Sequence, residues 1–151
     1  MKYPFNTIKV ILFYTTLILF TCISVSLTAA KKATPVEIQK ITEAIPATIQ
    51  SAKKYKVLVF SKAFTYYHSS IAVAKEMARQ MGEKTGLFEA DFTDDPKDLS
   101  AENLKNYDTV YLNNSTSIER GLTTEKMRNE FIEYVRNGGG LVAIPAATDG
   151  G

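Results

Sequence analysis

Residues 138–151 read GGGLVAIPAATDGG, which puts three glycines, an apolar run and a loop of small residues in immediate succession. A phosphate-binding glycine loop follows a strand and precedes a helix. Here the order is reversed, because the glycines follow a helical pattern and precede the apolar run. They predict a helix end. Since ligands bind where the strands of an open α/β sheet end, the stretch predicts a strand over residues 141–144 that leads into a candidate binding loop.

Upstream of this stretch, short apolar runs alternate with amphipathic ones. Further strands are predicted at 57–60, 87–92 and 109–112, where β-forming residues cluster or alternate. Helices are predicted from Ser69 or Ser70 to Gly82 and Gly86, from Ser100 through Leu104, and from Thr123 to Gly138. The alternation predicts the α/β class, with a doubly wound parallel sheet that has helices on both faces. Such a sheet normally continues beyond its fourth strand, so we expect the sheet to be truncated there and the chain to be a fragment.

Two of these helices show an apolar stripe with the spacing of three or four residues that buries one helix face. In the helix after the first strand, the stripe comprises Ile71, Ala74, Met77, Ala78 and Met81. In the helix before the fourth strand, it comprises Met127, Phe131, Tyr134 and Val135. Both stripes are expected to pack on the sheet.

The first thirty residues have the layout of a secretory signal peptide. Lys2 and Lys9 precede an uncharged apolar run over 11–27, and small residues precede Lys31. We expect cleavage after Ala30, and an uncleaved anchor or a lipoprotein modified at Cys22 are the alternatives. Residues 31–54 then form a linker, with a short helix ending before Pro46, and 55–151 form the domain. The protein is expected to be exported to the periplasm or cell envelope, with membrane contact only through an uncleaved leader.

The composition excludes several kinds of chemistry. The chain has 18 basic and 16 acidic residues, and removal of Lys2 and Lys9 with the leader leaves 16 of each, so no basic patch favours nucleic acid. Cys22 is the one cysteine and lies in the leader, which leaves the exported part without a disulfide, thiolate ligand or cysteine nucleophile. A single histidine does not make a histidine-rich metal site. Neither a metal nor a cofactor is predicted.

Three loops follow predicted strands and should meet at one edge of the sheet: 61–70, 113–117 and 145–149. His68 is the candidate for proton transfer, or else it hydrogen-bonds the start of the following helix. Asn113 is a candidate sugar contact, or else holds its own loop. Asp149 either contacts a hydroxyl or His68, or caps a further helix. A nucleophile elbow is excluded, because residues 145–147 supply neither Ser nor Cys.

Several segments together resemble the ThuA-like (trehalose utilisation) domain. They are residues 56–62, the step from Tyr67 to Ile71, the strand from Asp108 to Asn113, and 122–140 followed by 146–149. The resemblance spans about Tyr55 to Asp149 and covers the N-terminal half of that domain.

This resemblance implies a flavodoxin-like sheet related to class I glutamine amidotransferases but without their cysteine, in bacterial proteins linked to carbohydrate use. His68 corresponds to the histidine of the family's Arg-His step, and Thr148 with Asp149 to its Ser/Thr-Asp pair. Tyr67 stands where the family usually has arginine, and Pro145 where it usually has histidine. The expected ligand is a small carbohydrate bound or processed with His68, Asn113, Thr148 and Asp149, and the alternative is a non-catalytic binding or scaffold module of the cell envelope.

Overall fold

The computed structural model describes residues 32–46 and 53–148. The predicted signal peptide and Asp149 lie outside these ranges. Within them, no helix combines the length and apolar character that a membrane crossing requires.

The predicted sheet is present, with all strands parallel and in the order β2-β1-β3-β4. Its strands are β1 (Tyr55–Phe60), β2 (Phe88–Thr93), β3 (Thr109–Leu112) and β4 (Gly140–Ala143). Each lies within two residues of its predicted position. The α/β class and the flavodoxin-like arrangement are therefore confirmed.

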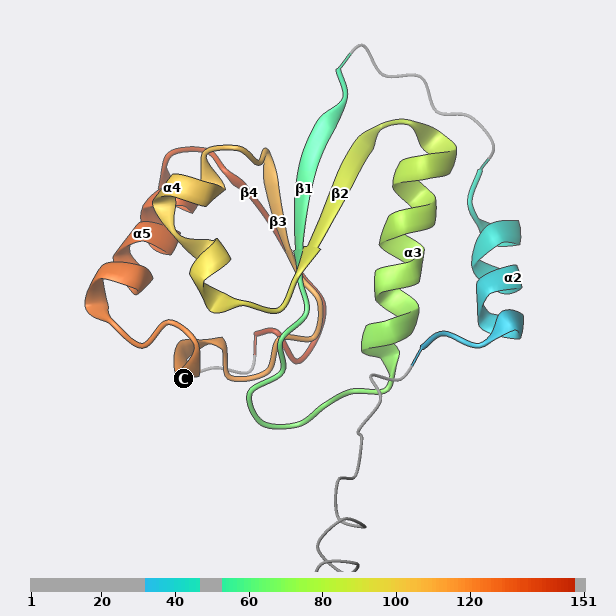
Figure 1. Ribbon diagram of the computed structural model, residues 1–151. Helices are drawn as coiled ribbons and strands as arrows, with labels where there is room; N and C mark the ends of the chain where they lie inside the picture. Colours follow the sequence, from blue (N-terminus) through green and yellow to red (C-terminus); the bar gives the residue numbers. More distant parts are fainter. Residues whose placement is uncertain (1–31, 47–52, 149–151) are drawn as a thin grey trace, which may run out of the picture. The chain divides into compact units, whose positions relative to one another are not determined.

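Helices cover both faces of this sheet (Figure 1). The helix α3 (Ser70–Thr85) connects β1 to β2 and lies on one face, whereas α4 (Ala101–Leu104) and α5 (Glu125–Arg136) lie on the other. The step from β1 to β2 runs in one direction across the sheet, and the steps to β3 and β4 run in the opposite direction. Because parallel crossovers are right-handed, this reversal places the helices on opposite faces. Two short 3-10 turns in the described chain, η1 (Pro96–Leu99) and η2 (Ile118–Arg120), lie in the connections.

The larger core lies between the sheet and the α4–α5 layer. Strand register sets Leu58 beside Val110 and Phe60 beside Leu112, and all four side chains are buried. Burial of apolar surface contributes about 25 cal/mol per Å², so these central strands anchor the sheet. The edge strand β4 is less covered, and Val142 is 49% exposed.

The helix α3 extends past one of its predicted ends. It runs through Gly82 and ends at Gly86, whose φ of 66° is the left-handed geometry that glycine favours at a helix C-terminus. The prediction that Gly82 ends the helix is wrong. This glycine instead allows α3 to pack closely against β2. A Cβ there would lie 2.8 Å from the carbonyl oxygen of Phe88 in β2.

The apolar stripe of α5 is correct for three of its four residues. Met127, Phe131 and Tyr134 pack against the larger core, but Val135 is 37% exposed. Each residue turns a helix by about 100°, so two steps of four residues rotate Val135 about 80° away from Met127. Tyr134 returns to the stripe. The helix itself begins at Glu125, two residues after the predicted start at Thr123, and is capped by the Thr124 hydroxyl, which accepts a hydrogen bond from Met127 N at 3.2 Å.

The stretch predicted as a linker contains α2 (Pro35–Ala44), which ends before Pro46 as expected. Thr34 caps its start in a reciprocal arrangement with Glu37. The Thr42 hydroxyl donates to Gln80 of α3 at 2.7 Å, and Lys84 donates to the Thr42 carbonyl. This helix is therefore packed on α3.

Candidate functional site

The loops after β1, β3 and β4 begin at the carboxyl edge of the sheet. The parallel hydrogen-bond ladder continues into them, because Asn113 N donates to Phe60 O at 2.9 Å and Ile144 N donates to Leu112 O at 3.1 Å. Polar side chains are buried along this edge: Ser61, Asn113, Asn114, Ser115 and Thr116. Buried polar groups require hydrogen-bond partners. The partners of these side chains show which of them hold the loops together.

Asn113 forms the floor of the edge and is completely buried. Its amide nitrogen donates to the Ile71 carbonyl at 3.0 Å and to the Ser61 hydroxyl at 3.2 Å. Its amide oxygen accepts from the Asn114 side chain at 3.3 Å. Asn113 thus joins the end of β3 to the start of α3. Direct contact with a ligand would require exchange of these bonds, so its role as a ligand contact stays a prediction.

The loop after β1 is docked on the loop after β3. Phe64 N donates to the Thr116 carbonyl at 3.1 Å, and the Thr116 hydroxyl donates to the Tyr66 carbonyl at 3.2 Å. The Phe64 ring lies over Gly121, where a Cβ would come within 2.3 Å of it. The two loops therefore share one edge, as the sequence predicts.

His68 lies half-buried in the first of these loops. Its carbonyl accepts a hydrogen bond from Ile71 N at 3.1 Å, and its ring meets the Tyr66 ring edge-on, with centroids 4.7 Å apart. Within the described residues, no hydrogen bond reaches the imidazole. The backbone carbonyl of His68 thus stabilises the start of α3. The nitrogen atoms of its ring remain available to hydrogen-bond another molecule.

Strained backbone is concentrated at the same edge. Among the described residues, the non-glycine positions with positive φ are Asn114 (51°), Ser117 (53°) and Ala146 (77°). All three belong to the loops after β3 and β4. Such conformations cost free energy and gather at functional sites, so this edge is the best supported location for one.

A small pocket opens beside Thr148, which is exposed. Its volume is about 270 Å³, and its lining includes Glu119, Leu122, Arg128, Phe131, Ile132 and Thr148. One carboxylate oxygen of Glu119 is buried without a hydrogen-bond partner in the described part of the chain. Glu119 and Arg128 are not among the site residues predicted from the sequence. The signal available was weak, namely a carboxylate between the apolar residues Ile118 and Leu122.

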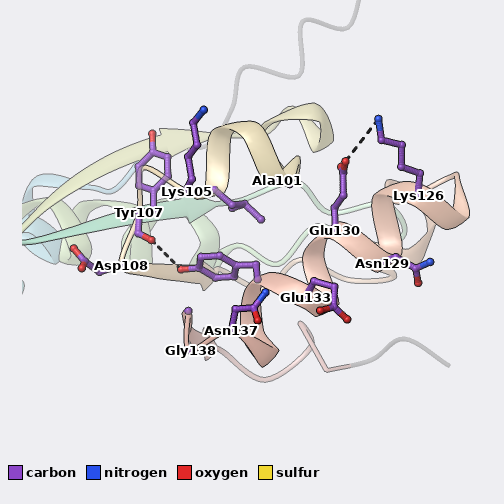
Figure 2. Close-up of a pocket in the computed structure, with 13 residues that line it drawn as sticks. Ala101, Lys105, Tyr107, Asp108, Lys126, Asn129, Glu130, Glu133, Asn137 and Gly138 are labelled. Atoms are coloured by element: carbon purple, nitrogen blue, oxygen red, sulfur yellow. Dashed lines mark hydrogen bonds and ion pairs between the residues drawn. The ribbon is translucent and has the colours of Figure 1, made fainter.

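A larger pocket of about 700 Å³ lies at the opposite, amino edge of the sheet, between α4 and α5 (Figure 2). The Tyr134 hydroxyl donates to the Tyr107 carbonyl at 3.3 Å, and Lys126 pairs with Glu130 at 3.7 Å. Two further lining carboxylates pair with residues outside the pocket lining, Asp108 with Lys53 at 2.6 Å and Glu133 with Arg136.

Electrostatic shifts follow these contacts. The hydrogen bond from Lys53, with a second from Lys56 N, lowers the pKa of Asp108. Burial, followed by the hydrogen bond to Asp91, raises the pKa of Tyr107. Within the described ranges, no three His, Cys, Asp or Glu side chains gather closely enough to hold a metal ion.

The sheet and its loop-bearing carboxyl edge define a flavodoxin-like α/β protein. A family model described as ThuA, trehalose utilisation, matches residues 56–150. The chain belongs to this family, and membership suggests a role in trehalose utilisation. Comparison with curated proteins and with solved structures gives no match.

Proposed function

We propose that this ThuA domain binds or processes a sugar or sugar derivative at the carboxyl edge of its sheet, after export to the cell envelope. The observation that carries the proposal is the meeting of the β1 and β3 loops over a buried polar floor built on Asn113. Convergent polar groups at a strand-end edge are a common form of ligand site. Family membership supplies the class of ligand.

In this proposal His68 moves a proton, and Thr148 and Asp149 contact hydroxyl groups of the ligand. A ring that has no hydrogen bond within the described chain can serve as acid or base for a bound molecule. The only cysteine is Cys22, in the expected leader. Covalent thiol chemistry therefore has no place in the proposal.

The second candidate is a binding module without catalysis. A histidine that transfers protons is usually held by an orienting group, and no described residue bonds the imidazole of His68. The chain also differs from the usual family pattern at two positions, because Tyr67 and Pro145 stand where the family usually has arginine and histidine. These features favour binding over turnover.

His68→Ala separates the two candidates. The full chain is titrated by calorimetry with disaccharides and their keto forms, and conversion is followed by NMR. Processing predicts that the variant loses turnover by about 100-fold or more, as expected for a general acid or base, while binding changes little. A binding module predicts no turnover in either protein and unchanged binding.

Ser69→Ala is the matched control, because the Ser69 side chain makes no cap hydrogen bond. It should bind and turn over like the wild type. If no saccharide binds the wild-type protein, both candidates are rejected.

A further inference from the structure

The pocket beside Thr148, here called the Glu119 pocket, joins three separate segments. The 3-10 turn η2 contributes Glu119, α5 contributes Arg128, Phe131 and Ile132, and the segment after β4 contributes Thr148. Its volume of about 270 Å³ lies just below the range of about 300–1,000 Å³ typical of sites for drug-sized ligands. A ligand of about one ring fits this volume.

Glu119 has an unmet hydrogen-bonding requirement. Its Oε2 atom is buried, and no described residue donates a hydrogen bond to it. A buried acceptor without a partner costs free energy, so proteins retain one where it serves a purpose. A second such atom, Tyr111 Oη, is not among the groups that line this pocket. Glu119 therefore both lines the pocket and has a carboxylate oxygen that lacks a partner among the described residues.

Arg128 supplies the complementary group. Its Nη1 atom donates to the Leu122 carbonyl at 2.8 Å, which holds the guanidinium at the pocket. That bond uses one of five N–H donors. No ion pair within 4.0 Å joins Glu119 to Arg128. The pocket thus presents an acceptor and a donor that do not satisfy each other.

This pair determines the charge of a suitable ligand. A cation would be attracted by Glu119 but repelled by Arg128, and an anion would meet the reverse. A neutral molecule with adjacent donors and acceptors suits both groups. The apolar surfaces of Phe131 and Ile132 suit the C–H face of a ring. These properties together describe a pyranose.

We propose that the Glu119 pocket is a subsite for one sugar ring. One ring hydroxyl donates to the Glu119 carboxylate, a neighbouring ring oxygen accepts from Arg128, and the C–H face lies against Phe131. This inference rests on the proposed function, and it adds to that function the residues that would select a neutral polyol. Thr148, already a predicted contact, lies at the rim of the same pocket.

The test is calorimetric titration of the full chain with trehalose and glucose, with ethanolamine and acetate as charged probes. Glu119→Gln and Arg128→Gln should each weaken trehalose binding at least tenfold. The control Glu125→Gln lies in the exposed first turn of α5, outside the lining of the pocket, and should stay within twofold of the wild type. Glu119→Gln should also raise the thermal midpoint of the unliganded protein, because the unpaired charge is removed.

Each outcome bears on the subsite. If trehalose binds the wild type and Glu119→Gln equally well, the subsite is overturned while the proposed function stands. If no sugar binds the wild type, both are overturned. Binding of ethanolamine or acetate without sugar, lost in Glu119→Gln, overturns the choice of a neutral ligand. A lower thermal midpoint for Glu119→Gln identifies a structural role and also counts against the subsite.

Discussion

The two edges of this sheet differ in what their pockets offer. The amino edge has the larger cavity, about 700 Å³, but several of its charged side chains are already paired, as Lys126 is with Glu130 and Asp108 with Lys53. The carboxyl edge has a cavity of about 270 Å³ lined by Glu119, one of whose carboxylate oxygens is buried without a hydrogen-bond partner in the described chain. Volume reflects the space that α4 and α5 leave between them. Unpaired polar atoms and strained backbone are better indicators of a binding site.

Topology explains the difference. At the amino edge the chain passes directly from a helix end into a strand. At Asn137–Gly140, for example, a few glycines are sufficient to connect α5 to β4. At the carboxyl edge the chain leaves β1 and β3 through longer loops that must find partners for their own backbone. Asn114 and Ser117 adopt positive φ in doing so. The irregular backbone of the described chain is therefore concentrated at the carboxyl edge.

The largest expected effect tests whether the buried floor of the carboxyl edge is structural. Asn113→Asp should lower the free energy of unfolding by about 3 kcal/mol or more, because it buries an unpaired charge and removes the donor to Ile71 O. Asn129→Asp is the matched control at the amino edge, where Asn129 is exposed. It should cost about 0.5 kcal/mol or less. Urea unfolding at pH 7 measures both.

The pH dependence of Asn113→Asp gives a second check. Burial raises the pKa of the introduced carboxyl in the folded state. The deficit in stability should therefore be small in acid, and it should grow as the pH rises above the unfolded value of about 3.9. A deficit that does not change with pH would show that lost packing, not buried charge, is responsible.

Two glycines provide a comparison of packing at the two edges. A Cβ at Gly121 would meet the Phe64 ring at 2.3 Å, and a Cβ at Gly139 would meet the Tyr134 ring at 2.4 Å. Gly121→Ala should cost about 2 kcal/mol, within the usual range for overpacking, because Phe64 is held between two docked loops. Gly139→Ala should cost less than about 1 kcal/mol, since Tyr134 borders an open pocket. Equal losses by urea unfolding would contradict this account.

The fold was predictable because its signals are local and repeated. The apolar run at 57–60 and the glycine stop at 138–140 are each sufficient to place an element within two residues. The features that were predicted wrongly depend on tertiary contacts. Gly82 resembles a helix stop in sequence, and only the approach of Phe88 explains why it lies inside α3.

The position of the candidate site follows from the strand order, whereas its full set of residues does not. Strand order implies that the loops containing His68 and Asn113 share an edge, and the contacts from Phe64 to Thr116 confirm it. Glu119 was not predictable in the same way, because the proposal for it rests on the lack of a partner among the described residues. A missing hydrogen bond leaves no trace in the sequence.

The smallest expected effect concerns the paired carboxylate at the amino edge. The Lys53 ammonium and then Lys56 N lower the pKa of Asp108. The stabilisation is therefore present above the unfolded value of about 3.9 and is lost as the pH falls through the lower folded value. Asp108→Asn should reduce the urea midpoint slightly at pH 7, and the difference from wild type should vanish in acid. Added salt should shrink it as well, because the pair is exposed to solvent.

Asp94→Asn is the control for this measurement, because Asp94 follows β2 at the carboxyl edge and makes no hydrogen bond within the described chain. It should leave the midpoint unchanged across the same pH range. If Asp94→Asn and Asp108→Asn showed the same acid dependence, the pairing of Asp108 would contribute nothing specific. The contrast between the edges would then rest on the buried floor and on Glu119 alone.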